Sequence, residues 1–290
     1  MATEAMPGSS VLVVTVAYHS SDTIAGFLAS VPHALGSARA DVVVADNASA
    51  DADRTRGVVE SAGASFVALP ENLGYGAGID AGIDAAAGAH EYLLIANPDL
   101  VLHEGAVARL IDAAQRHPDA AALGPRILAE DGSTYPSARR FPALGTGIGH
   151  AVLSAFAPGN RFSRRYRADD DYEHERTADW LSGSCLLVRA DAYRAVGGFD
   201  HRFFMYFEDV DLGRRLVDAG WRNVYVPDAV ATHLGARSTS TNPRAMLHEH
   251  HRSAYRYLSL RYPHWYQAPL RWALRAALAV RARWETRGMR

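Results

Sequence analysis

The chain has 290 residues, with 30 basic and 32 acidic side chains, and 48% of its residues are hydrophobic. This length suffices for one large α/β core with a helical appendage, and the near balance of charge argues against a dedicated nucleic-acid-binding protein. Neither a signal peptide nor an apolar run of the roughly 20 residues needed for a membrane span is expected, and the single cysteine, Cys185, predicts a buried thiol in a reducing, cytoplasmic setting.

From residue 11 to about residue 128, short β-branched runs alternate with alanine-rich segments. The expected strands are residues 11–16, 42–44, 65–68 and 91–96, and the expected helices are residues 21–35, 51–62, 76–87 and 104–116. This alternation is typical of an α/β fold in which helices cover a parallel sheet. Ligands of such sheets bind at the carboxyl ends of the strands, so the polar residues that follow the strands are candidates for a site.

The second half of the chain is less regular. Residues 143–178 combine glycines and prolines with a charged run and show no sustained period, so we expect a mobile insertion there. The pattern then predicts a central strand over residues 179–188, a helix over 210–219 that ends at Gly220, and two strands at 224–226 and 230–232.

After about residue 242 the composition becomes rich in arginine, histidine and aromatic residues, with helix breaks expected at Pro263 and Pro269. We therefore expect one α/β domain over residues 1–242 and a helical extension over residues 243–290. In the last helix a leucine stripe is flanked by arginines, so this helix could pack on the domain or lie on an anionic membrane surface. We expect His248, His250 and His251 to lie on a solvated surface.

The second predicted strand ends in the segment from Ala45 to Ser49. Asn47 and Ser49 suit turn formation and helix capping, but Asp46 belongs to the strand end itself and capping explains it poorly. Its carboxylate could accept the imide N–H of a uracil or thymine ring. Asp46 is therefore a candidate contact to a nucleotide base.

Three glycines alternate in the segment from Asn72 to Gly78, which opens a predicted helix. Such a segment lets backbone amides approach a ligand and directs the positive end of the helix at an anion. A flexible turn before a helix explains the same residues, and the spacing is not a strict dinucleotide fingerprint. Both interpretations stay open at this point.

Asn97, Pro98 and Asp99 follow a buried strand. A carboxylate at a strand end can hold a hard divalent cation against phosphate oxygens, although Asn-Pro and Pro-Asp are also common in turns. His233 ends a later strand and could add an imidazole nitrogen to the same cation, although a lone histidine is more often a hydrogen-bonded surface residue. The nucleotide-like first half favours the metal interpretation for Asp99.

An acidic cluster follows an aromatic run directly in the segment from Phe203 to Asp211. Acidic residues at a helix start complement the helix dipole, and the spacing of Asp211 and Arg215 predicts a structural ion pair. Glu208 and Asp209 would be desolvated by the surrounding aromatic surface, which raises the pKa of a carboxyl group and makes it a better general base.

Six segments, taken in order, resemble the family 2 glycosyltransferases, which are inverting enzymes of GT-A fold. They are Thr15 to Tyr18, Ala45 to Ser49, Asn72 to Gly76, Asn97 to Asp99, Trp180 to Ser184 and Phe207 to Leu212. The segments from Gly197 to Asp209 and from His250 to Tyr257 are similar to the rhamnosyltransferase branch of that family. The resemblance covers residues 11 to 240 and implies a Rossmann-like nucleotide-binding half with a mixed central sheet.

The resemblance also implies roles for particular residues. Asp209 is expected to be the catalytic base with Glu208 beside it, and Asp99 with His233 is expected to hold Mg²⁺ or Mn²⁺ at the donor diphosphate. Trp180 and Arg140 are expected near the acceptor. The residues expected at the nucleotide sugar are Thr15, Ala17, Asp46, Asn72, Gly74, Gly76 and Asn97. Asn97-Pro98-Asp99 replaces the usual Asp-x-Asp, so metal affinity is expected to be modest.

The implied reaction moves a sugar, L-rhamnose from dTDP-L-rhamnose, to a hydroxyl of a polyprenyl-diphosphate-linked N-acetylglucosamine in cell-wall or polysaccharide synthesis. The enzyme would then work in the cytoplasm, in peripheral contact with the inner face of the plasma membrane, without a nucleic-acid partner. A galactofuranosyltransferase or other hexosyltransferase of the same family is the alternative enzyme. A noncatalytic sugar-nucleotide-binding protein is the alternative from another class, and the oligomeric state is not readable from the sequence.

Overall fold

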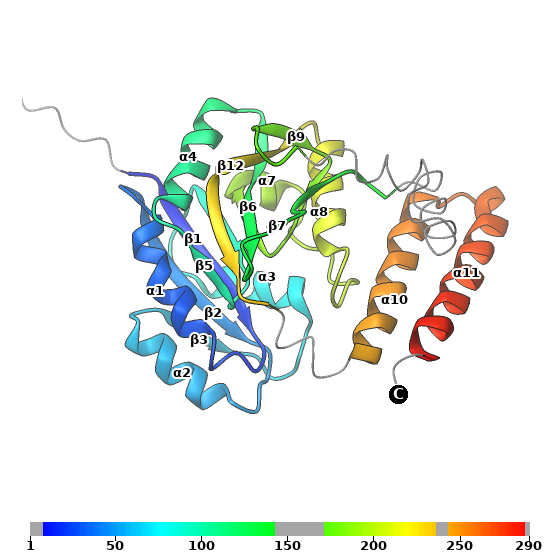
Figure 1. The fold of residues 1–290 in the computed structure, drawn as a ribbon, viewed down its shortest axis with the longest axis horizontal. Helices are drawn as coiled ribbons and strands as arrows, with labels where there is room; N and C mark the ends of the chain where they lie inside the picture. Colours follow the sequence, from blue (N-terminus) through cyan, green and yellow to red (C-terminus); the bar gives the residue numbers. More distant parts are fainter. Residues whose placement is uncertain (1–7, 143–170, 236–242, 288–290) are drawn as a thin grey trace, which may run out of the picture.

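A mixed β-sheet with helices on both faces forms the body of the molecule (Figure 1). The computed structural model describes residues 8–142, 171–235 and 243–287. The first half contains β1 (Ser10–Ala17), α1 (Ile24–Ala34), β2 (Arg39–Asp46), α2 (Ala52–Ser61), β3 (Ser65–Ala68), α3 (Tyr75–Ala85), β4 (Tyr92–Ala96), β5 (Leu100–Leu102) and α4 (Ala106–Arg116).

The second half contains shorter strands and fewer helices. Its elements are β6 (Ala120–Ala129), β7 (Thr134–Tyr135), β8 (Ala138–Arg139), β9 (Arg176–Ala178), β10 (Trp180–Leu181), β11 (Cys185–Arg189), α7 (Ala190–Ala195), α8 (Glu208–Asp218) and β12 (Arg222–His233). The chain continues into α10 (Pro243–Arg261), the 3₁₀ turn η2 (Trp265–Gln267) and α11 (Ala268–Arg287).

The strand order of the main sheet is β3-β2-β1-β4-β11-β6-β12-β5. Strands β1 to β4 pair in parallel, as the alternation of strands and helices predicts, and β11 pairs antiparallel with both β4 and β6. All five residues of β4 are buried, whereas the four residues of β3 are partly or fully exposed, because β3 lies at the edge of the sheet. The expected α/β fold with a mixed central sheet is confirmed.

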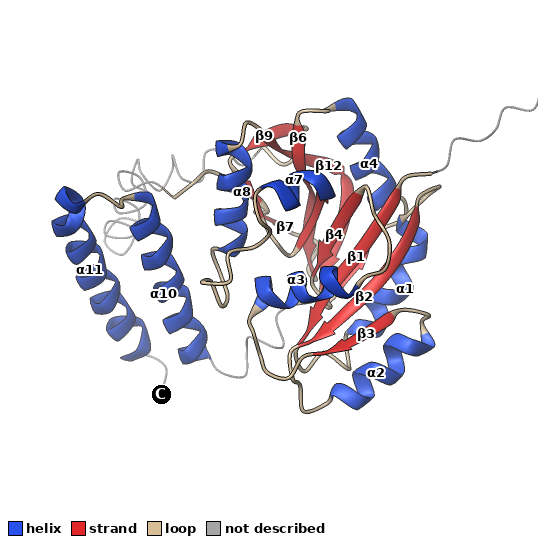
Figure 2. Ribbon diagram, turned by 180° about the vertical axis from the view of Figure 1, so that it is seen from behind, coloured by secondary structure: helices blue, strands red, loops and turns tan. Residues whose placement is uncertain are grey.

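Successive residues of β1 pack on opposite faces of the sheet, because side chains alternate along a strand. Val11 and Val13 join a core with α1, α2 and α4, whereas Leu12 and Val14 join a core with α3, α7 and α8. Figure 2 shows α3 and α7 on the face opposite to α1 and α2. Each fully buried valine or leucine contributes roughly 1.5–3 kcal/mol, and these two cores hold the strand ends in place.

Two predicted strand patterns are corrected. The run expected as one strand over residues 179–188 is two strands in different sheets, because β10 pairs with β8 and, after the bend from Ser182 to Ser184, β11 joins the main sheet. The two strands expected at 224–226 and 230–232 are one strand, β12, with an irregularity between Val226 and Val230. Pro227 lies in that irregularity and cannot donate to a ladder hydrogen bond.

The last residues of the expected insertion at 143–178 belong to the sheet domain. Residues 143–170 lie outside the described residues, but β9 is part of the sheet and pairs antiparallel with β12. Tyr172 packs edge-on against Tyr225 with ring centroids 5.6 Å apart. Strand pairing and this aromatic contact therefore hold residues 172–178, the last part of the predicted insertion, on the sheet domain.

The C-terminal extension is a helical hairpin of α10 and α11. In Figures 1 and 2, α10 lies between the sheet domain and α11. The helix α10 ends just before Pro263, as expected. Pro269 does not break a helix, because it occupies the first turn of α11, where no intrahelical N–H donor is needed. Leu274 of α11 is buried, so one side of this helix packs within the hairpin.

Candidate active site

The parallel strands bring several predicted residues to one edge of the sheet. Ala17 at the end of β1 is in register with Asp46 at the end of β2, and β4, which ends just before Asn97, is the other neighbour of β1. Ala17 contributes its backbone carbonyl, which accepts a hydrogen bond from the Asn47 N–H over 2.9 Å. The carboxyl ends of three strands thus form the edge at which α/β proteins bind ligands.

Asp46 and Thr15 are completely buried at this edge. One carboxylate oxygen of Asp46 accepts the Ser49 N–H over 2.8 Å. Its other oxygen and the Thr15 hydroxyl have no hydrogen-bond partner among the described residues. Buried polar atoms are nearly always paired in folded proteins, so these two atoms lack the partners that such atoms ordinarily have.

The glycine-rich segment is explained by close packing. Gly74 has a φ of +87°, and a Cβ there would lie 2.2 Å from the Phe204 carbonyl oxygen. A Cβ on Gly76 would lie 2.7 Å from the Phe199 side chain. The Gly74 N–H donates to Asn72 Oδ1, and the Tyr75 N–H donates to the Phe204 carbonyl. The Gly74 amide is thus paired with Asn72 in this structure, and its contact with a nucleotide sugar stays a prediction.

Asp99 and His233 lie together although 134 positions separate them. Antiparallel pairing of β12 with β5 sets His233 opposite Leu100, and His233 Nε2 lies 3.0 Å from Asp99 Oδ1. Asn97 Nδ2 lies 3.4 Å from the same ring nitrogen. His233 is therefore not the isolated surface histidine of the alternative interpretation.

The chemistry of this group fits a divalent cation. A single ring nitrogen cannot donate to the Asp99 carboxylate and accept from the Asn97 amide at once. A carboxylate oxygen, an imidazole nitrogen and, after a turn of the Asn97 amide, an amide oxygen form a suitable ligand set. No cluster of three or more His, Cys, Asp or Glu side chains occurs within residues 8–142, 171–235 and 243–287. The protein would therefore supply an incomplete shell, as the single carboxylate predicts.

Glu208 and Asp209 begin α8 directly after two strained residues. Tyr206 and Phe207 have φ angles of +66° and +68°, a left-handed conformation that is unfavourable for large side chains. Asp209 Oδ2 accepts the Gly183 N–H over 3.0 Å, and Oδ1 accepts the Val210 N–H over 2.8 Å. The turn thus places the Asp209 carboxylate against the bend between β10 and β11.

The two neighbouring carboxyl groups differ in environment. Burial, the charge of Asp209 and that of Glu249 raise the pKa of Glu208 well above its ordinary value. Burial also raises the pKa of Asp209, but the Gly183 and Val210 N–H groups and the charge of Arg139 oppose that rise. The two N–H donors therefore favour the charged form of Asp209, whereas Glu208 Oε2 is buried without a hydrogen-bond partner among the described residues.

Tyr75 links the base to the metal-binding group. Its hydroxyl donates to the Gly183 carbonyl over 2.7 Å, and the next residue, Ser184, accepts the Asn97 N–H over 2.8 Å. Burial raises the pKa of Tyr75, and the charges of Glu208, Asp209 and Asp99 raise it further. The bend between β10 and β11 therefore binds both the Asp209 carboxylate and the backbone of Asn97, and a single site containing Asp99 and Asp209 stays a prediction.

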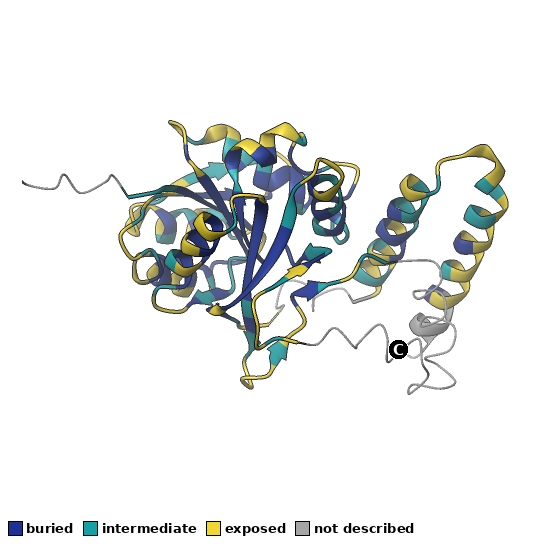
Figure 3. Cartoon of the chain, turned by 90° about the horizontal axis from the view of Figure 1, so that it is seen from above, coloured by how far each residue is buried: buried dark blue, intermediate teal, exposed yellow. Residues whose placement is uncertain are grey.

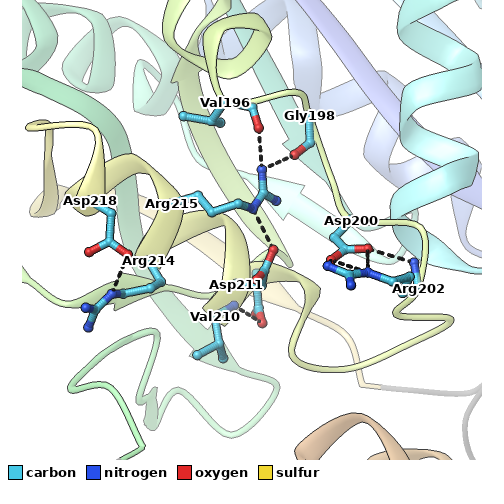
Figure 4. Close-up of polar contacts among 10 residues, drawn as sticks. Val196, Gly198, Asp200, Arg202, Val210, Asp211, Arg214, Arg215 and Asp218 are labelled. Carbon is cyan, nitrogen blue, oxygen red and sulfur yellow. Dashed lines mark hydrogen bonds and ion pairs between the residues drawn. The ribbon is translucent and has the colours of Figure 1, made fainter. Parts of the chain in front are cut away.

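The position of α8 is fixed by Arg215 (Figure 4). Arg215 pairs with Asp211 over 2.7 Å, as their spacing predicts, and it also donates to the carbonyls of Val196 and Gly198 over 2.7 Å each. These bonds tie the helix to the loop that follows α7. These contacts therefore help to fix the start of α8, which carries Asp209.

The residues expected at the acceptor lie beside this helix start. The Trp180 indole N–H donates to the Arg140 carbonyl over 3.0 Å. The Arg139 guanidinium lies 5.6 Å from the centre of the Trp180 ring. Trp180 also packs on an apolar cluster that contains Val210 and Tyr257. The β8–β10 ribbon thus brings aromatic and basic groups next to Asp209.

Helix α10 contacts the strained turn before Glu208. Ser253 Oγ donates to the Met205 carbonyl over 2.8 Å. The His250 ring lies 5.4 Å from Tyr206 and 5.5 Å from Phe207, measured between ring centroids. The C-terminal extension is therefore part of the framework of the site.

A profile of the family "Glycosyltransferase like family 2" matches residues 7–256. The chain belongs to the family 2 glycosyltransferases. It is 44% identical over 280 residues to the N-acetylglucosaminyl-diphospho-decaprenol L-rhamnosyltransferase of Mycobacterium tuberculosis, covering 93% of this chain and 91% of that one. It is 29% identical over 171 residues to the rhamnosyltransferase WbbL of Escherichia coli, covering 58% and 62% of the two chains.

Solved structures show the same GT-A fold for this glycosyltransferase. The mannosyltransferase PcManGT from Pyrobaculum calidifontis, solved with GDP-Man and Mn²⁺, matches with a TM-score of 0.57 at 15% identity over 94% of this chain and 71% of that one. Staphylococcus aureus TarS matches with a TM-score of 0.55 at 15% identity, and the match spans 84% of this chain and 39% of TarS. At such low identity these likenesses establish the fold alone.

Sequence reasoning missed several residues of the glycosyltransferase site. Tyr75, Gly183 and Ser253 act through contacts between distant segments, which no local pattern reveals. His251, expected on a solvated surface, is buried with Nδ1 2.7 Å from the Leu247 carbonyl. Cys185 is buried as expected, and burial raises the pKa of its thiol to about 12. The described helices include none with the length and hydropathy of a membrane span.

Proposed function

We propose that this glycosyltransferase transfers L-rhamnose from dTDP-β-L-rhamnose to a hydroxyl of a polyprenyl-diphosphate-linked N-acetylglucosamine, with inversion at the anomeric carbon. The main support is the 44% identity over 93% of the chain with a mycobacterial enzyme named for an L-rhamnosyl transfer to such an acceptor. A lipid-linked acceptor requires the site to reach a membrane. The enzyme therefore acts in the cytoplasm, peripherally at the inner face of the plasma membrane.

The strand-end edge binds the donor in this proposal. The unpaired Asp46 oxygen accepts the imide N–H of the thymine ring, and Thr15 adds a hydroxyl to the same buried edge. Asp99, His233 and Asn97 would hold Mg²⁺ or Mn²⁺. When bound, such a cation neutralises charge on the diphosphate oxygens.

Asp209 is the general base of the transfer. Its carboxylate takes the proton from the acceptor hydroxyl while the acceptor oxygen attacks the anomeric carbon from the face opposite the nucleotide. The bond between the anomeric carbon and the diphosphate oxygen breaks, which releases dTDP and an α-L-rhamnoside. Burial raises the pKa of Glu208, which favours the neutral form of this carboxyl group beside the base. Trp180 and Arg140 flank the acceptor.

The test is a product analysis with purified enzyme. Donors are dTDP-L-rhamnose, UDP-galactofuranose, UDP-glucose and GDP-mannose, and the acceptor is N-acetylglucosaminyl diphosphate with a short prenyl chain. The proposal expects rhamnosyl transfer from dTDP-L-rhamnose with Mg²⁺ or Mn²⁺, and loss of transfer with EDTA. Transfer from another donor alone would assign a hexosyltransferase of different specificity. Donor binding without transfer to any acceptor would support the noncatalytic alternative.

A further inference from the structure

The most exposed large hydrophobic side chains of the described residues all lie on the C-terminal hairpin. They are Trp265, Trp272, Val280 and Tyr266, which are 85%, 70%, 66% and 61% exposed. No other large hydrophobic side chain in the described part of the chain exceeds the 41% of Tyr135. Figure 3 shows the contrast with the sheet, whose strands are mostly buried.

The exposed side chains lie on one face of α11 and at the turn before it. Trp272, Ala276 and Val280 are four residues apart and lie on one face of α11, while Leu274 is buried on the face toward α10. Trp265 and Tyr266 lie at the turn that joins the two helices. Arg271 fixes this turn by donating to the carbonyls of Tyr262 and His264 over 2.7 and 2.9 Å. The turn is thus held in place while its aromatic rings remain in water.

The charge of the hairpin differs from that of the rest of the chain. Residues 243–290 contain 10 arginines and two glutamates, whereas residues 1–242 contain 20 arginines and 30 carboxylic side chains. A basic helix with exposed tryptophans suits an anionic lipid surface, where indole rings settle at the level of the headgroups and arginines meet the phosphates. An RNA partner would use the charges but gives no reason for the apolar stripe of α11.

We propose that the outer face of α11 and the η2 turn form a docking surface for anionic phospholipid headgroups. The proposal deepens the proposed function, on which it rests for the presence of a lipid-linked acceptor. Helix α10, the inner helix of the hairpin, packs through Tyr257 on the apolar cluster that also contacts Trp180. Docking of α11 therefore sets the acceptor side of the site next to the membrane from which the acceptor comes.

The test is co-sedimentation of the full chain with vesicles of phosphatidylcholine alone or with one third phosphatidylglycerol, at low and high salt. We expect binding that requires phosphatidylglycerol and weakens at high salt, because arginine–headgroup attraction is screened. Trp265→Ala combined with Trp272→Ala should lower the partition coefficient about tenfold or more. Arg275→Glu should lower it as well, whereas Arg194→Glu, at an exposed position of α7 in the sheet domain, is the matched control and should not.

Activity separates this proposal from the proposed function. The Trp265/Trp272 variant should keep wild-type turnover on a short-chain acceptor in solution and lose it on a long-chain acceptor embedded in vesicles. Vesicle binding that is independent of lipid charge, or unchanged in the variants, would overturn the docking surface. So would a tryptophan-dependent dimer in analytical ultracentrifugation, or RNA binding that competes with vesicles. Lipid binding without rhamnosyl transfer would leave the docking surface standing and remove only the proposed function.

Discussion

The sheet domain and the C-terminal hairpin bury their apolar residues to very different extents. Strands β1 and β4 lie between two cores, whereas the hairpin leaves Trp265 of η2 and Trp272 of α11 largely in water. The first region holds carboxylates at fixed positions, and the second carries an excess of arginine. The two regions meet at the strained Tyr206–Phe207 turn, which α8 follows on one side and α10 contacts on the other. The start of α8, which carries the proposed base Asp209, therefore depends on contacts from both regions.

The largest effect is expected at the base, within the sheet domain. Asp209→Asn removes the proton acceptor but keeps the side-chain shape, so turnover should fall about 10²- to 10⁴-fold. The dissociation constant for dTDP should stay near the wild-type value. Rapid-quench kinetics and calorimetry measure the two quantities, and Asp218→Asn, at the exposed end of the same helix, is the control. Near-normal turnover of Asp209→Asn would remove this residue from the role of base.

The metal-binding group should respond next. Asp99→Asn and His233→Ala each remove one proposed ligand, so the Mn²⁺ concentration for half-maximal activity should rise at least about tenfold. His103→Ala is a near control, because His103 lies 2.9 Å from the Thr232 hydroxyl on the strand that carries His233. Titration of EDTA-treated enzyme with Mn²⁺ gives the measurement. Equal metal requirements in His233→Ala and His103→Ala would show that His233 is not a ligand.

The sheet domain was the more predictable of the two regions. The apolar runs around Val13 and Leu94 are buried because their pattern leaves no polar face. The positions of Asp46 and Asp99 could be predicted because each follows or ends a strand. The antiparallel insertion of β11 and the single β12 strand depend on pairings between distant segments. The sequence suggested ligand contacts at Gly74 and Gly76. Only the fold reveals that Phe204 and Phe199 pack closely against these two glycines.

The hairpin contacts were less predictable, because they depend on tertiary packing. His250 and Ser253 belong to a stretch whose composition indicates only a polar helix. Their partners, Tyr206 and Met205, lie more than 40 positions earlier in the chain. Long-range contacts of this kind have no local sequence pattern, which explains why the helix was expected to be solvated.

Glu208 offers a test by pH. Burial raises its pKa above the ordinary value of 4.5. At pH values between 4.5 and the folded pKa, the folded protein therefore keeps a proton that the unfolded chain loses. Stability should therefore fall by about 1.4 kcal/mol for each pH unit up to the folded pKa. Glu208→Gln should remove this slope and be more stable than wild type, increasingly so from pH 5 to pH 8. Denaturant unfolding at several pH values measures it, and parallel curves for the two proteins would contradict the raised pKa.

The smallest effect tests the contact between the two regions, and α10 provides a matched pair of serines. Ser253→Ala removes the hydrogen bond to the Met205 carbonyl and should reduce the free energy of unfolding by roughly 0.5–1.5 kcal/mol. Ser259 Oγ is buried without a partner among the described residues, so Ser259→Ala should be neutral or slightly stabilising.

Turnover distinguishes a local stability effect from support of the site. If α10 holds the Tyr206–Phe207 turn in its left-handed conformation, Ser253→Ala should lower kcat while the KM for the donor stays unchanged, because Asp46 and Asp99, the proposed donor-side residues, belong to strand ends and not to this turn. Ser253→Thr, which keeps the hydroxyl, should restore part of the loss, and Ser259→Ala should leave kcat unaltered. A Ser253→Ala enzyme with lower stability and full kcat would mean that the sheet domain maintains the strained turn without help from the hairpin.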